Sequence, residues 1–204
     1  GVNAGNSIAS GGNYNVVVGD EAGTAISTGD ENVFMGYKAG QAVSTGSANV
    51  AIGNEALHTE DGHGRNVAVG LQSLYTLNAG ADAYNTAVGY QSGKLINTGI
   101  QNTLIGGLAG DSLTSGSANV AVGYLALSTE DAHGTNVAVG YQTLNALNAG
   151  VDSYNTAVGA NAGVLVTTGV QNTLIGGLAG DALTDADYNI AIGVNALGAD
   201  TLGS

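Results

Sequence analysis

Short aliphatic segments recur along the whole chain, and each follows an Asn and precedes a Gly. Residues 66–70 read Asn-Val-Ala-Val-Gly, and residues 136–140 repeat the same five letters. These segments are rich in β-branched residues, and neighbouring side chains alternate in kind, which is typical of a strand rather than a helix. The pattern therefore predicts one short strand in every repeat, and repeats must be considered before domains or sites.

The asparagines set the register of the repeat, so we number positions within each unit from the Asn, as position 0. Successive units are 17 residues apart, apart from two spacings of 19. The ladder asparagines are Asn15, Asn32, Asn49, Asn66, Asn85, Asn102, Asn119, Asn136, Asn155, Asn172 and Asn189. The position 4 glycines are Gly19, Gly36, Gly53, Gly70, Gly89, Gly106, Gly123, Gly140, Gly159, Gly176 and Gly193. Such units predict an all-β, parallel β-solenoid of about eleven coils of 17–19 residues.

The alternation within each strand also predicts which side chains form the core. Position 3 is aliphatic in every unit except for Met35, so we assign positions 1 and 3, such as Val67 and Val69, to the core. Position 2, usually Ala, then faces outward, and its larger members form a candidate assembly face. These members are Val17, Phe34, Leu104 and Leu174.

Position 11 carries a second aliphatic residue in most units, which predicts a second short strand. Two units have Glu60 and Glu130 there instead, and we expect Leu57 and Leu127, three residues earlier, to compensate in the core. The unbroken register predicts a single solenoid domain over residues 15–204, preceded by an irregular segment over residues 1–14.

The two 19-residue units carry two extra residues near their ends, which predict slightly longer loops on one edge of the stack. Exposed tyrosines can stack on sugar rings, and they can equally shield the ends of coils. The candidate exposed ligand residues in these loops are Asp82, Tyr84, Asp152 and Tyr154.

The net charge is −13, and Lys38, Arg65 and Lys94 are the basic residues of the chain. This balance argues against binding to nucleic-acid backbones and to anionic membranes through a basic patch. No apolar run is long enough for membrane insertion. The absence of Cys fits an exposed extracellular rod without requiring one.

The sequence shows no catalytic set and no cofactor motif, so we expect neither an enzyme nor a bound cofactor. The runs Thr59-Glu60-Asp61-Gly62-His63 and Thr129-Glu130-Asp131-Ala132-His133 could gather two carboxylates and an imidazole as metal ligands. A solvated turn, duplicated with its 70-residue block, explains the runs more simply, and we predict no metal site.

The pentads and their turns, such as residues 89–93 and 36–40, resemble the repeats of YadA-type trimeric adhesin heads. Residues 155–159 with Thr168-Gly169 resemble the repetitive shafts of phage tail fibres and related secreted fibre proteins. The resemblance covers nearly the whole chain. It implies a left-handed parallel β-roll that assembles as a homotrimer.

Two classes of function remain open. The first is a structural and adhesive fibre segment, on a virion or cell surface, that presents receptor-binding parts. Its partners would be two further copies of the chain and a cell-surface glycan or protein receptor. The second is a monomeric solenoid that binds ice or a glycan. Oligomeric state discriminates the two classes.

Overall fold

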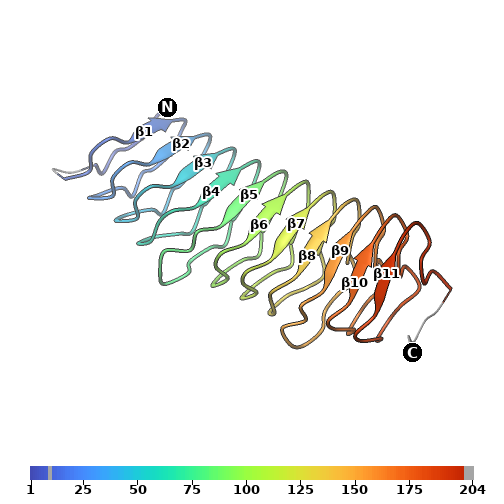
Figure 1. The fold of residues 1–204 in the computed structure, drawn as a ribbon. Coiled ribbons are helices and arrows are strands. Elements are labelled where there is room, and N and C mark those ends of the chain that lie inside the picture. The colour runs from blue at the N-terminus through green and yellow to red at the C-terminus, as the bar shows by residue number, and fades with distance from the viewer. Residues whose placement is uncertain (9–10, 200–204) are drawn as a thin grey trace.

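The computed structural model describes residues 1–8 and 11–199, and these form one elongated stack of coils. Each coil contributes one three-residue strand, and the strands lie side by side in chain order along one side of the stack (Figure 1). The strands are β1 (Val16–Val18), β2 (Val33–Met35), β3 (Val50–Ile52), β4 (Val67–Val69), β5 (Thr86–Val88), β6 (Thr103–Ile105), β7 (Val120–Val122), β8 (Val137–Val139), β9 (Thr156–Val158), β10 (Thr173–Ile175) and β11 (Ile190–Ile192). The predicted all-β parallel solenoid is confirmed.

The repeat register of the sequence is also the pairing register of the sheet. All neighbouring strands are parallel, and equivalent positions face one another, as Val67 faces Thr86 across a 19-residue spacing. The two extra residues of a long coil are therefore absorbed in the loop before the next strand. No helix in the described residues is long and apolar enough to cross a membrane.

The core is a narrow column inside the coils, filled by a few side chains per turn. Positions 2, 7 and 11 supply most of it; in the coil that begins at Asn102 these are Leu104, Ala109 and Leu113. In coils with Leu at position 8, such as Leu74, that side chain is buried as well. Position 7 carries a small residue in every coil, such as the fully buried Ala109, and this suits the narrow core.

The asparagines form a hydrogen-bonded ladder along the inside of the stack. In a typical rung the backbone N–H of Asn119 donates to Oδ1 of Asn102 over 3.0 Å. The side-chain amide of Asn102 donates in turn to the carbonyl of Gly116 over 2.9 Å, which closes the coil. The side chain of Asn102 thus connects the start of the next coil with the end of its own coil. It satisfies two backbone groups, the N–H of Asn119 and the carbonyl of Gly116, that strand pairing leaves without a partner.

The turn after each strand requires Gly for two separate reasons. Gly70 has a φ of +136°, which L-residues rarely adopt, and a Cβ at this position would collide with the carbonyl oxygen of Gly89 on the next coil. The position 4 glycines therefore stack directly on one another.

Two sequence-based expectations about the coil are wrong. The faces of the strand are reversed: position 2 points into the core, where Ala68 is fully buried, while Val67 and Val69 are partly exposed. Position 11 is buried, as Leu77 shows, but among the described residues each coil has a single strand, so position 11 lies in a turn-rich segment without a second strand. Ala at position 2 signals a narrow interior, and it does not signal an exposed face.

The leading segment folds onto the first coil. Gly5 donates its N–H to the carbonyl of Ala22, and Glu21 donates to the carbonyl of Val2. Residues 200–204 of the predicted solenoid domain lie outside the described residues.

Candidate functional site

The most distinctive surface of the molecule is the outer face of the sheet, which we call the strand face. It consists of positions 1 and 3 of every coil, which are Val16, Val18, Val33, Met35, Val50, Ile52, Val67, Val69, Thr86, Val88, Thr103, Ile105, Val120, Val122, Val137, Val139, Thr156, Val158, Thr173, Ile175, Ile190 and Ile192. None of these side chains is buried, and none is charged. The result is a continuous stripe, almost entirely of β-branched residues, that runs the whole length of the stack.

The strand face consists of two rows of side chains that follow an in-register parallel sheet along the stack. Neighbouring strands of a sheet are about 4.8 Å apart, so the ten intervals between the eleven strands make a stripe about 48 Å long. Isolated exposed aliphatic residues are common on proteins, whereas a contiguous and largely apolar stripe of this length is unusual on a free protein surface.

Tyrosines border the strand face on both sides. At position 5, Tyr124 and Tyr141 on adjacent coils stack with ring centroids 5.9 Å apart. On the opposite border, the position before the ladder Asn, Tyr154 and Tyr188 are largely exposed. These rings extend the apolar surface and carry hydroxyl groups at its rim, a combination that is frequent at protein interfaces.

Charge is segregated away from the strand face. The two bordering rows together contain only Asp20, Glu31 and Arg65 as charged residues, all in the first four coils. Among the residues that the structure describes, the other charged side chains occupy the remaining sides of the coils. Covering the strand face would therefore bury a large apolar area while removing few charged groups from water.

The predicted assembly face of Val17, Phe34, Leu104 and Leu174 is wrong in its orientation. Phe34, Leu104 and Leu174 are fully buried inside the coils, and Val17 packs against the same core. The exposed stripe is instead formed by the residues that the sequence analysis assigned to the core. The orientation of the strand could have been recognised from residue size. Position 2 is usually Ala, position 3 is always large, and a thin coil has room inside only for the smaller residue.

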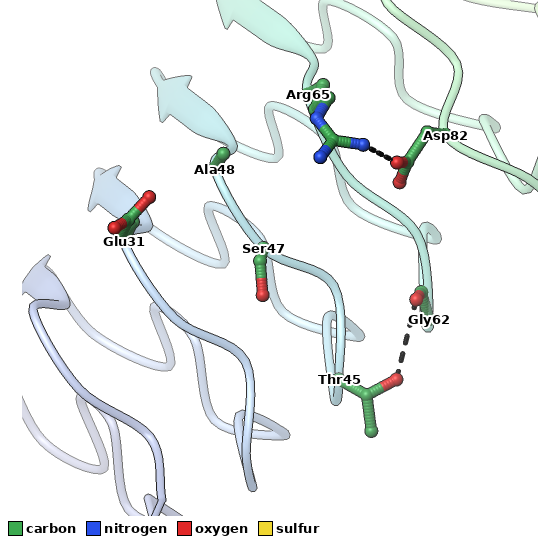
Figure 2. Close-up of a pocket in the computed structure, with 7 residues that line it drawn as sticks. All are labelled: Glu31, Thr45, Ser47, Ala48, Gly62, Arg65 and Asp82. Carbon is green, nitrogen blue, oxygen red and sulfur yellow. Dashed lines mark hydrogen bonds and ion pairs between the residues drawn. The ribbon is translucent and has the colours of Figure 1, made fainter.

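A small polar pocket of about 220 Å³ lies beside the first of the two longer loops, residues 80–84 (Figure 2). It is lined by Glu31, Thr45, Ser47, Ala48, Gly62, Arg65 and Asp82. Arg65 forms an ion pair with Asp82, and the other carboxylate oxygen of Asp82 accepts the backbone N–H of Gly64 over 3.0 Å. The guanidinium is thus already paired, and the other polar side chains of the lining are the carboxylate of Glu31 and the hydroxyls of Thr45 and Ser47.

The candidate ligand loops have structural roles as well as exposed side chains. Asp152 accepts the N–H of Gly134 over 2.9 Å, as Asp82 does from Gly64 in the first loop. Tyr84 and Tyr154 are more than half exposed, and the guanidinium of Arg65 lies 5.5 Å from the ring centroid of Tyr84. The two loops lie four coils apart, so the structure does not bring them together into one site.

The structure does gather the repeated Glu, Asp and His residues. The potential ligand atoms of Glu60, Asp61 and His63, the first trio, all lie within 4.8 Å of one another. Those of Glu130, Asp131 and His133, the second trio, are arranged in the same way. Burial raises the pKa of the Glu130 carboxyl. The third histidine, His58, stacks on Tyr75 with ring centroids 5.0 Å apart, and burial lowers its pKa.

Comparison with protein-family models, with curated proteins and with solved structures gave no match. The function of the chain must therefore be inferred from its geometry and from the resemblance of its repeats.

Proposed function

We propose that this chain is a structural segment of an extracellular fibre, on a virion or cell surface, and that it assembles as a parallel homotrimer through its strand face. The observation that carries the proposal is the uncharged stripe of β-branched residues that runs along all eleven coils of a chain with net charge −13. The proposal of three copies rests on the resemblance of the repeats to trimeric adhesin heads and tail-fibre shafts.

The size of the strand face is sufficient for stable association. With its two bordering rows it is about 20 Å wide and about 50 Å long, or about 1,000 Å². A standard protein interface buries about 800 Å² on each partner. Association of the whole stripe would therefore reach the size of a specific interface, whereas a fragment of two or three coils would not.

A parallel arrangement follows from the proposed number of copies, because three identical chains related by a three-fold axis all run in the same direction. In parallel copies, each row meets its own counterpart at the same spacing of about 4.8 Å, so the match continues along the full length. Because Asp20 and Glu31 are the only described carboxylates in the strand face and its bordering rows, the copies can approach with few like charges in contact. The assembled rod would hold receptor-binding parts, such as a glycan-binding or protein-binding domain, away from the body that carries it.

Sedimentation of the purified chain at micromolar concentration tests the proposal. We expect three times the chain mass, and we expect added salt to strengthen association, because salt screens repulsion between acidic copies and leaves apolar burial intact. Ile105→Glu on the strand face should dissociate the assembly. Leu95→Glu is the matched control, since both aliphatic side chains are exposed to a similar extent, 40% and 45%, and Leu95 lies off the face.

A monomeric binding solenoid is the second candidate, because the core is closed within one chain and needs no partner to fill it. On this alternative the regular strand face, with hydroxyls at Thr86, Thr103, Thr156 and Thr173, would bind an extended ligand such as ice or a glycan. A folded monomer that stays monomeric at high salt would overturn the trimer and favour this alternative.

A further inference from the structure

Two glutamates occupy a row of the core that is otherwise aliphatic. Position 11 carries a buried aliphatic residue in the other described coils, namely Ile26, Val43, Leu77, Ile96, Leu113, Leu147, Val166 and Leu183. Glu60 and Glu130 stand in the same row, and both are fully buried. A carboxylate is costly in such a place unless a partner compensates its charge.

Backbone groups compensate these carboxylates only in part. Glu60 accepts N–H groups from His63 over 3.1 Å and from Ala79 over 3.4 Å. Glu130 repeats the pattern at 3.2 Å and 3.4 Å. Within the described residues neither glutamate forms an ion pair with a lysine or arginine. Each carboxylate therefore keeps unused acceptor capacity in a buried position.

The side chain that faces each glutamate is a histidine with an unused ring nitrogen. Nδ1 of His63 lies 3.5 Å from Oε1 of Glu60, and Nδ1 of His133 lies 3.5 Å from Oε1 of Glu130. Both Nδ1 atoms are shielded from solvent, and neither makes a hydrogen bond. An unprotonated imidazole nitrogen and a carboxylate oxygen both present lone pairs, so a proton or a cation is needed between them.

The dimensions favour a cation. Zn²⁺ binds imidazole nitrogen and carboxylate oxygen at about 2.0–2.2 Å, so two ligands of one tetrahedral ion are about 3.4 Å apart. The observed 3.5 Å fits this spacing and is long for a charge-assisted hydrogen bond. Asp61 and Asp131 supply the third ligand atom of each trio, a carboxylate oxygen within 4.8 Å of the other two ligand atoms, from exposed side chains.

The two 70-residue blocks differ at four positions around the trio, whereas the trio itself, like Leu57, Thr59 and Gly64, is the same in both. Between them Glu55 is replaced by Leu125, His58 by Ser128, Gly62 by Ala132 and Arg65 by Thr135. The glutamate, the aspartate and the histidine are the same in both blocks, at the same positions of their coils. A turn that needed only solvation would not require an acid in the core row or an imidazole facing it.

We propose that each trio, Glu60 with Asp61 and His63, and Glu130 with Asp131 and His133, is a binding site for a borderline divalent cation such as Zn²⁺. A simple solvated turn, as predicted from the sequence, does not account for the burial of both glutamates. The ion would neutralise the buried carboxylate and fasten the turn of the coil to its core row. Solvent would complete the coordination, because His63 is only partly buried. This site is independent of the strand face and of the oligomeric state.

Zinc titration of chelator-treated full chain, read by calorimetry and by metal content after dialysis, tests the proposal. We expect two ions per chain. His63→Gln should bind one ion, and the double variant with His133→Gln should bind none, while His58→Gln, which alters the histidine outside the trios, should still bind two. Saturating zinc should raise the melting temperature of the wild type by about 5–10 °C and leave that of the double variant unchanged.

Two further measurements keep the test decisive. Glu60→Gln and Glu130→Gln preserve shape and remove charge, so each should lose one ion, and circular dichroism of each metal-free variant establishes that it is folded. Zinc binding that is unchanged in the histidine double variant would assign the ions to surface carboxylates and overturn the proposal. Absence of zinc binding by the wild-type chain would overturn it as well.

Discussion

The ring of Phe34 occupies the space that a side chain on Gly40 would need: a Cβ atom at Gly40 would lie 2.6 Å from Cε2 and from Cζ of the ring. Phe34 stands at position 2 and Gly40 at position 8 of the same coil. Coils with Leu at position 8 have Ala at position 2, as in the pairs Leu57 with Ala51, Leu74 with Ala68, Leu127 with Ala121 and Leu144 with Ala138. In these coils positions 2 and 8 therefore compete for the same space in the core. Where both residues are small, as in Ala87 with Gly93, leucines of the neighbouring coils reach that space instead.

This shared volume predicts a compensating pair of substitutions at Leu104 and Gly110. A Cβ at Gly110 would lie 2.8 Å from Cδ2 of Leu104, so Gly110→Leu alone should overpack the core. Leu104→Ala alone should leave a cavity and lower the free energy of unfolding by about 2–5 kcal/mol. Together the two changes recreate the Ala–Leu pairing of the neighbouring coil.

The double variant should consequently be more stable than the sum of the single changes allows, with a coupling of about 1–3 kcal/mol in chemical denaturation. Additive losses would show that the two positions do not share space. Some net loss will remain, because Leu104 also packs against Gly93 of the preceding coil, where an added Cβ would lie 2.7 Å from Cδ1 of Leu104.

The period, the strand positions and the single-stack architecture could be predicted from the sequence, because each depends on residues that recur at fixed spacing. The orientation of the strand could not, since alternation separates two faces without saying which one is inside. Hydrophobicity favoured Val67 and Val69 for the interior, and size was the deciding factor: a coil of 17 residues has room for Ala68. The burial of Glu60 also escaped prediction, because a buried carboxylate in a turn looks like a solvated one in sequence.

Replacing a position 4 glycine tests whether steric collision between neighbouring coils adds to the cost of backbone strain. Gly70→Ala should destabilise strongly, because the new Cβ would collide with the carbonyl oxygen of Gly89 at a φ of +136°. Gly80→Ala is the matched control: its φ is also positive, +70°, but nothing lies within 4 Å of its Cβ. Gly80→Ala should cost about 1–2 kcal/mol from strain alone. Equal losses of melting temperature would mean that stacking between coils contributes nothing at Gly70.

The stability of the chain should depend on pH through Asp111. Burial raises the pKa of this carboxyl above its ordinary 3.8, and Oδ1 is buried without a hydrogen-bond partner. As the pH rises past 3.8, the unfolded chain releases this proton before the folded chain does, so the free energy of unfolding falls until the folded pKa is passed. Asp111→Asn should therefore raise the urea midpoint at pH 7, and its advantage should vanish below pH 3.8. A variant less stable than the wild type at pH 7 would contradict this assignment.

The asparagine ladder predicts different effects for two replacements of one residue. Asn102 accepts the N–H of Asn119 and donates to the carbonyl of Gly116. Asn102→Leu should leave both backbone groups buried and unpaired, at a cost of about 1–3 kcal/mol each. Asn102→Asp keeps an acceptor for Asn119 but sets a carboxylate oxygen against the carbonyl of Gly116, so it should destabilise the chain by a different route.

Hydrogen exchange at the amide of Asn119 separates the two routes. Asn102→Leu should abolish its protection, whereas Asn102→Asp should preserve it at a pH where the variant remains folded. Asn97→Ala is the control, because Asn97 is an exposed side chain in the preceding coil and should change stability by no more than about 0.5 kcal/mol. If all three variants exchanged and unfolded alike, the ladder would be a consequence of the fold and would contribute little to its stability.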